Sequence, residues 1–153
     1  MDTQIPDTPR KGRGAVSNRT GRFEAHEAVA IDDGWGSALD ADIPPLRTTL
    51  TAEATKKIVT RNQSPDVPFD RSINPYKGCE HGCVYCFARP THAYLGLSPG
   101  LDFESRLFYK PDAAALLEKE LRSSKYKCAV MAMGTNTDPY QPAERELNIT
   151  RRI

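Results

Sequence analysis

The chain has 153 residues, of which 21 are basic and 20 acidic, so its formal net charge is +1. A balance this close to neutral excludes strong nonspecific binding to DNA by charge alone. No apolar run approaches membrane-spanning length, and the first residues lack the apolar core of a signal peptide. Four cysteines in 153 residues are too sparse for the disulfide framework of a small secreted domain.

Residues 1–70 are predicted to form a mostly extended or disordered leader, because prolines and polar stretches recur along them. The start of this leader is mildly basic at Lys11–Gly14 and Arg19–Arg22. That composition suits a solvated tail, with contact to nucleic-acid phosphates as the alternative. The only tryptophan, Trp35, lies between glycines in a predicted turn.

Three cysteines stand within eight residues, at Cys79, Cys83 and Cys86. A [4Fe-4S] cluster takes one cysteine sulfur at each iron that the protein binds. Three cysteines therefore predict three ligated irons and a fourth that is open to a substrate or cofactor. Gly78 and Gly82 relax the backbone around the first of these ligands.

Zinc is the competing metal for the same cysteines. Three thiolates and one histidine complete a tetrahedral zinc site, and His81 and His92 both lie near in sequence. Zinc fingers usually pair two cysteines with a second, distant pair, which this sequence lacks, so we favour iron. Free thiolates of this kind survive poorly in oxidising compartments, and we predict a cytoplasmic protein.

The segment after the cysteines is predicted to contain a crossover helix between two parallel strands. Residues 101–110 fit either a short strand or the approach to the helix. The helix begins after Pro111–Asp112, and Glu118 pairs with Arg122 on its outer side. Its apolar face is formed by Ala113, Leu116, Leu117 and Leu121.

The two strands are predicted over Arg71–Pro75, which is weakly marked, and over the apolar run 128–133. Cys128 opens the second strand about 20 Å from its carboxyl end, so we expect a buried core residue and not a fourth ligand. The loop Gly134–Pro139 then emerges on the face of the cysteines, where α/β folds place ligands. A capped turn is the alternative for this loop. A further helix is predicted to begin around Asn148–Thr150.

The cysteine spacing, with Tyr85 directly before the last cysteine, resembles the signature of the radical S-adenosylmethionine (SAM) superfamily. The segments Asn74–Cys79, Cys86–Tyr94 and Gly134–Pro142 are similar to the branch related to spore photoproduct lyase, described as DNA repair photolyase-like. The resemblance implies an α/β fold in which residues 71–153 form the N-terminal portion of a partial (β/α) barrel. Two strands and one helix cannot cover their own apolar surfaces, so we expect a fragment of a longer fold.

The same resemblance implies an enzyme that binds a [4Fe-4S] cluster through the three cysteines. It would reductively cleave SAM to methionine and a 5′-deoxyadenosyl radical, with a one-electron reductant such as flavodoxin or ferredoxin as partner. Thr135, Asn136 and Asp138 are the implied SAM contacts, and Tyr85 is expected near the adenine or the cluster unless it is an ordinary core aromatic. A DNA lesion is the candidate substrate by analogy. A zinc-stabilised binding module and an inactive truncation product remain alternatives.

Overall fold

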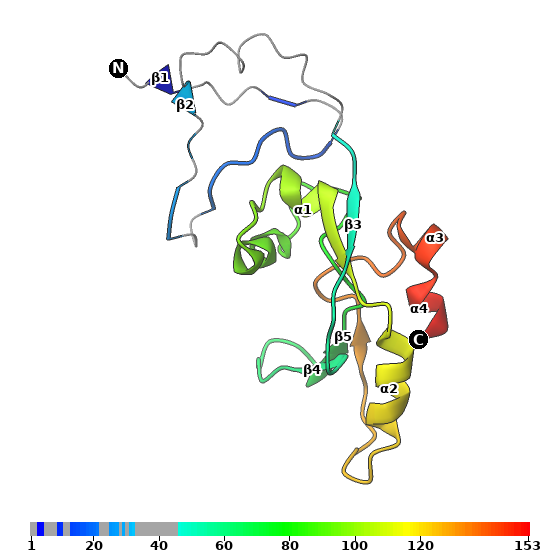
Figure 1. Ribbon diagram of the computed structural model, residues 1–153. Helices are drawn as coiled ribbons and strands as arrows, with labels where there is room; N and C mark the ends of the chain where they lie inside the picture. The colour runs from blue at the N-terminus through cyan, green and yellow to red at the C-terminus, as the bar shows by residue number, and fades with distance from the viewer. Residues whose placement is uncertain are drawn as a thin grey trace.

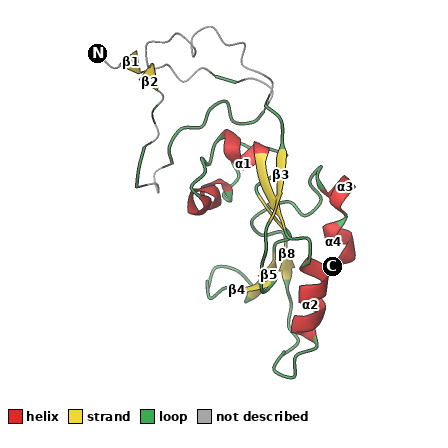
Figure 2. Ribbon diagram, in the orientation of Figure 1, coloured by secondary structure: helices red, strands yellow, loops and turns green. Residues whose placement is uncertain are grey.

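The computed structural model describes residues 3–4, 9–10, 13–21, 25–27, 29, 31–32 and 46–153. Within these residues the chain is mixed α/β, with three small sheets and short helices (Figures 1 and 2). Trp35 and part of the predicted basic start lie outside the described residues. In the described part of the chain, no helix has the length and apolarity to cross a membrane.

One sheet is built around β7 (Arg106–Tyr109), which has a partner on each side. β3 (Thr49–Ala52) pairs with β7 in parallel, and β6 (Tyr76–Lys77) pairs with it in antiparallel orientation. The register places Leu50 opposite Leu107, so apolar side chains meet across the parallel pair.

The second sheet is built around β5 (Arg71–Ile73). β4 (Val59–Arg61) is its antiparallel neighbour and β8 (Ala132–Met133) its parallel neighbour. The predicted parallel pairing of the two strands is therefore confirmed. A further two-stranded sheet joins β1 (Thr3–Gln4) to β2 (Ile31–Asp32).

Four segments that we assigned to the extended leader, β1 to β4, are paired strands instead. β3 and β4 both lie before residue 70, and each joins one of the two central sheets. Their alternation of Thr with Leu or Val is a strand pattern, which the many prolines of the leader outweighed in our prediction.

The prediction for the apolar run 128–133 is wrong over most of its length. Only Ala132 and Met133 are paired, Cys128 is exposed, and Val130 is 77% exposed. Since β5 begins at Arg71 and the register sets Ser72 opposite Ala132, residues 128–130 lie beyond the end of β5. β8 is also the edge strand of its sheet, so it is not buried on both faces as an internal parallel strand would be.

The helices are short, except for the predicted one, α2 (Ala113–Leu121). Residues 101–110 contain the predicted short strand, β7, whereas α1 (Leu101–Ser105), which runs directly into it, is a separate helix that was not predicted. A 3₁₀ helix, η1 (Arg89–Leu95), follows the cysteines. α4 (Ile149–Arg152) confirms the predicted helix start, whereas α3 (Glu144–Leu147) was not predicted.

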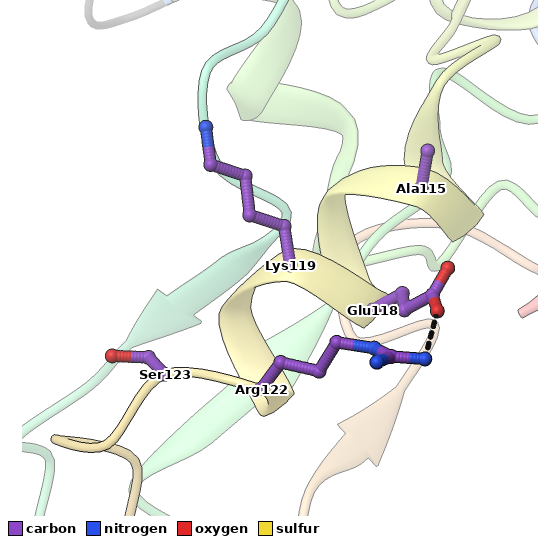
Figure 3. A pocket seen from close by; sticks show the side chains of 5 residues that line it. All are labelled: Ala115, Glu118, Lys119, Arg122 and Ser123. Atoms are coloured by element: carbon purple, nitrogen blue, oxygen red, sulfur yellow. Dashed lines mark ion pairs between the residues drawn. The ribbon is translucent and has the colours of Figure 1, made fainter.

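The predicted faces of α2 are largely confirmed. Ala113 and Leu117 are buried, whereas Leu121 at the end of the helix is 40% exposed, contrary to prediction. On the outer side, Glu118 and Arg122 form the predicted ion pair at 2.7 Å (Figure 3). The shallow hollow around this pair is lined by α2 and Ser123 and contains no cysteine, so it is not the site predicted above.

The main apolar core lies where the second sheet meets α2 and the last two helices. It is completed by partly buried residues from β3, β7 and the carboxyl end of the chain. Its buried members are Ile58, Ile73, Tyr76, Ala113, Leu117, Ala143 and Ile149.

Candidate functional site

The cysteine loop, Cys79–Cys86, connects β6 to η1, and glycines shape its entry. Gly78 has φ +79°, and a Cβ there would lie 2.8 Å from both Phe103 O and His92 Cε1. Gly82 has φ +64° within the loop. These positions favour glycine on both backbone and steric grounds, so the tight turn that we predicted around the first cysteine is present.

The three thiols of this loop differ in exposure. All are free; Cys79 is buried, Cys86 is half-buried and Cys83 is exposed. Cys79 packs with Ala88 and Phe103 in a small apolar cluster, and its N–H donates to Phe103 O at 2.9 Å. Burial raises the pKa of the Cys79 thiol, and hydrogen bonds from backbone N–H groups offset this only in part. Cys79 is therefore the fixed end of the loop.

The donor chemistry of the loop fits an iron–sulfur cluster, because three free thiols lie on one short, glycine-shaped segment. Within the described residues, however, no group of three or more His, Cys, Asp or Glu side chains is gathered closely enough to hold a metal ion. The difference between buried Cys79 and exposed Cys83 means that the thiols must turn toward one another for all three to ligate one cluster.

The loop that follows β8, residues 134–141, contacts the start of the cysteine loop, as the predicted topology required. Thr137 Oγ1 donates to Gly78 O at 2.7 Å, and Gln141 Nε2 donates to the same carbonyl at 3.3 Å. Gln141 Oε1 accepts from Glu80 N at 3.1 Å. Thr137 and Gln141 are both buried, so they fix the backbone on either side of Cys79.

The three polar residues that we predicted as SAM contacts lie in this second loop and already have protein partners. Thr135 Oγ1 lies 3.1 Å from Asn74 Nδ2, and Asn136 N donates to Asn74 Oδ1 at 2.9 Å. Asp138 Oδ1 accepts from Tyr140 N at 2.8 Å, which is the capped turn that we gave as the alternative. The side chain of Asp138 is 44% exposed, and Asn136 is exposed as well.

The aromatic and histidine candidates separate clearly. Tyr85 is 86% exposed, so its alternative assignment as an ordinary core aromatic is wrong. His92 is fully buried behind Gly78, with Nε2 at 3.0 Å from Arg106 O, and burial lowers its pKa. His81 lies inside the cysteine loop, where its Nε2 is 3.3 Å from Asp138 Oδ2. Of the two histidines, only His81 is on the loop surface and placed to join the cysteines.

The chain is 51% identical over 78 residues to uncharacterized proteins of Mycobacterium bovis and Mycobacterium tuberculosis. The match covers 51% of this chain and 23% of each relative. No family model and no solved structure matches the chain. The comparisons thus relate the chain to about a quarter of a longer protein whose description assigns no function.

Sequence reasoning missed the polar residues that hold the cysteine loop from outside. Gln141 lies between two prolines in a segment that we noted only for its family resemblance. Glu104 is fully buried, although it stands in an amphipathic stretch that showed no sign of a buried charge. A polar residue with this degree of burial becomes visible only when its distant partners are known.

Proposed function

We propose that this chain carries the cluster-binding part of a radical SAM enzyme related to spore photoproduct lyase. The observation that carries the proposal is the cysteine loop: Cys79, Cys83 and Cys86 are free, closely spaced and held in a turn that needs glycine at Gly78 and Gly82. When bound, the cluster would supply the electron for reductive cleavage of SAM.

The residues around the loop have defined tasks in this proposal. Cys79 is the ligand held by the fold, because its sulfur is buried and its N–H is bonded to Phe103 O. Cys83 and Cys86 are nearer to solvent and would ligate the cluster together with Cys79. The 134–141 loop, whose exposed residues include Asn136 and Asp138, would contact SAM.

The partners and the substrate follow from the same proposal. A one-electron reductant such as flavodoxin or ferredoxin would reach the cluster in a cytoplasmic setting. A DNA lesion is the substrate by analogy to the branch, and an enzyme of that kind acts on a base extruded from the duplex.

One observation favours zinc as the second candidate. The carboxylate of Asp138 lies 3.3 Å from Nε2 of His81, and a carboxylate beside a histidine is the usual outer partner of a zinc-bound imidazole. In that case Cys79, Cys83, Cys86 and His81 would form a structural zinc site, and the chain would be a binding module.

Anaerobic reconstitution followed by iron, sulfide and zinc analysis tests both candidates. We expect about four irons per chain and an electron paramagnetic resonance spectrum of the reduced sample that changes when SAM is added. Cys83→Ala should abolish cluster binding, whereas Cys128→Ala, which replaces another exposed cysteine, should leave the iron content unchanged. Stoichiometric zinc without iron would refute the enzyme proposal in favour of the zinc-binding module. An unchanged iron content in Cys83→Ala would refute the three-thiolate assignment.

A further inference from the structure

A segment from the start of the chain, residues 13–19, lies against the cysteine loop and α1, and we call it the strap. Its second half is bonded to the beginning of α1. Leu101 N donates to Ser17 O at 3.0 Å. Asn18 and Asp102 exchange two hydrogen bonds, of 2.9 and 2.8 Å (the strap is part of the blue trace in Figure 1). The strap is therefore attached to the folded part of the chain at a defined place.

The first half of the strap is held by a buried carboxylate. Glu104 is fully buried, and its two oxygens accept from Gly14 N at 3.0 Å and from Ala15 N at 2.7 Å. Arg89 forms an ion pair with the same carboxylate. A buried charge needs such partners, because an unpaired one is strongly unfavourable. Of the three donors that the described residues provide to Glu104, the strap thus supplies two.

Arg89 links Glu104 to the cysteine loop. Its guanidinium donates to Gly82 O at 2.8 Å and to Cys83 O at 3.0 Å. The strap also touches the loop directly, since a Cβ on Gly14 would lie 1.8 Å from Gly82 O. Backbone therefore packs on backbone at this point, and only glycine fits on the strap side.

Arg13 makes a second connection, to the residue that directly follows Cys79. Its guanidinium lies 3.5 Å from Glu80 Oε1 and donates to Thr48 Oγ1 at 2.8 Å. Thr48 in turn donates to the Glu80 carboxylate. The strap consequently grips the cysteine loop both next to the first cysteine and at the second.

We propose that the strap holds the cysteine loop in its observed shape, in which the Cys79 thiol is buried, and that Glu104 is the positioning residue through which it acts. Thr137 and Gln141 hold the start of the loop, and Arg13 and Arg89, with Glu104 behind it, add contacts that hold Glu80, Gly82 and Cys83. This inference rests on the proposed function only in assigning metal ligation to the loop; the contacts that hold the loop do not involve a metal.

The test measures the thiols of the metal-free chain one by one. A short pulse of iodoacetamide under anaerobic conditions, with site-resolved mass spectrometry, gives the alkylation rate of Cys79 relative to Cys128. Cys128 is exposed and far along the chain, so it is an internal reference. We expect Glu104→Gln and Gly14→Ala each to raise this ratio about tenfold, because local opening uncovers the buried thiol.

Matched controls separate the strap from general destabilisation. Glu118→Gln changes an exposed ion pair on α2, and Gly96→Ala adds a Cβ with nothing within 4 Å, although it strains a φ of +69°. Neither should change the ratio. Glu104→Asp keeps the charge that the donors require, and we expect it to recover part of the protection that Glu104→Gln loses.

Hydrogen exchange at Gly134, whose N–H donates to Ile73 O at 2.9 Å, reports on the sheet in the same samples. Cys79 must become more reactive while Gly134 stays protected. An unchanged alkylation ratio in Gly14→Ala would refute the proposed role of the strap. A rise in Cys79 reactivity that is matched by faster exchange at Gly134 would refute it as well. Strap-dependent protection of Cys79 in a chain that takes up no iron would refute the proposed function alone.

Discussion

Glu144 joins the last two helices to the core, and we expect its removal to destabilise the chain strongly. Glu144 is 9% exposed, and its carboxylate accepts from the N–H groups of Ile149, Thr150 and Arg151, each at 3.0 Å, at the start of α4. The buried hydroxyl of Tyr76 donates to the same carboxylate. Glu144→Ala therefore removes the cap of one helix and the hydrogen-bond partner of a core tyrosine.

The size of the effect follows from these contacts. Loss of a helix cap destabilises by about 1 kcal/mol. Leaving the Tyr76 hydroxyl buried without an acceptor adds about 1–3 kcal/mol. Because the contacts share one carboxylate, we expect a total loss of about 3 kcal/mol in the free energy of unfolding. With an m-value of about 2 kcal/mol/M, the urea midpoint would fall by about 1.5 M.

Urea titrations followed by circular dichroism measure this loss, with Glu146→Ala as the control. Glu146 lies on the same helix and is exposed, so its removal should change stability by less than about 0.5 kcal/mol. A Glu144→Ala variant within about 1 kcal/mol of the parent chain would refute the reasoning, because it would mean that the buried contacts contribute no more than surface ones.

The pH dependence of the same difference gives an independent check. Burial alone would raise the pKa of Glu144, but the hydrogen bonds from Tyr76 and the helix amides outweigh it and lower the pKa. A carboxylate with a lowered pKa stabilises the fold above its usual value of about 4.3 and loses that contribution as pH falls through the lowered pKa. The gap between parent and Glu144→Ala should thus be constant from neutral pH to about 5 and shrink below about 4.

Three further predictions concern single residues. Gly134→Ala should lower the free energy of unfolding by about 2 kcal/mol in urea titration, because Gly134 has φ +75° and a Cβ would lie 2.4 Å from Pro139 Cδ; a neutral effect would contradict the turn. Burial lowers the pKa of His92, so stability should fall as pH drops below about 6.5, and His92→Leu should weaken that dependence in thermal melts. If stability changed equally with pH in the parent and in His92→Leu, the pH dependence would come from other groups. Cys128→Ser should change the free energy of unfolding by less than about 0.5 kcal/mol, since Cys128 is exposed. A loss above about 2 kcal/mol would instead support the original prediction of a buried strand.

Local patterns predicted the elements whose surroundings are also local. The α2 helix follows from its apolar spacing, and its Glu118–Arg122 pair follows from two residues one turn apart. The pairing of β5 with β8 followed from the rule that a crossover helix joins two parallel strands of one sheet. The length of β8 did not follow from that rule. That length is set by where β5 begins, and the apolar run itself carries no information about its neighbour.

The candidate site shows the same division. The cysteines were visible because their spacing lies within eight residues. The contact between the 134–141 loop and the cysteine loop followed from topology, whereas the roles of Glu104 and Arg13 did not. These two residues are separated by 91 positions, and only the folded chain brings them together. Composition instead pointed to a solvated basic tail at Arg13, which the structure places beside the loop.

The long reach of the strap has a consequence for the order in which the protein is made. Gly14 leaves the ribosome before its acceptor Glu104, which follows 90 residues later, and Gln141 comes later still. At about 5–20 residues per second, the strap waits roughly 5–20 s for its partner. For the last part of that interval, the 18 residues from Cys86 to Glu104, the nascent chain contains all three thiols of the loop without the contacts that shape them. Protection of these thiols from oxidation, and any delivery of metal to them, is therefore a task for the cell before folding is complete.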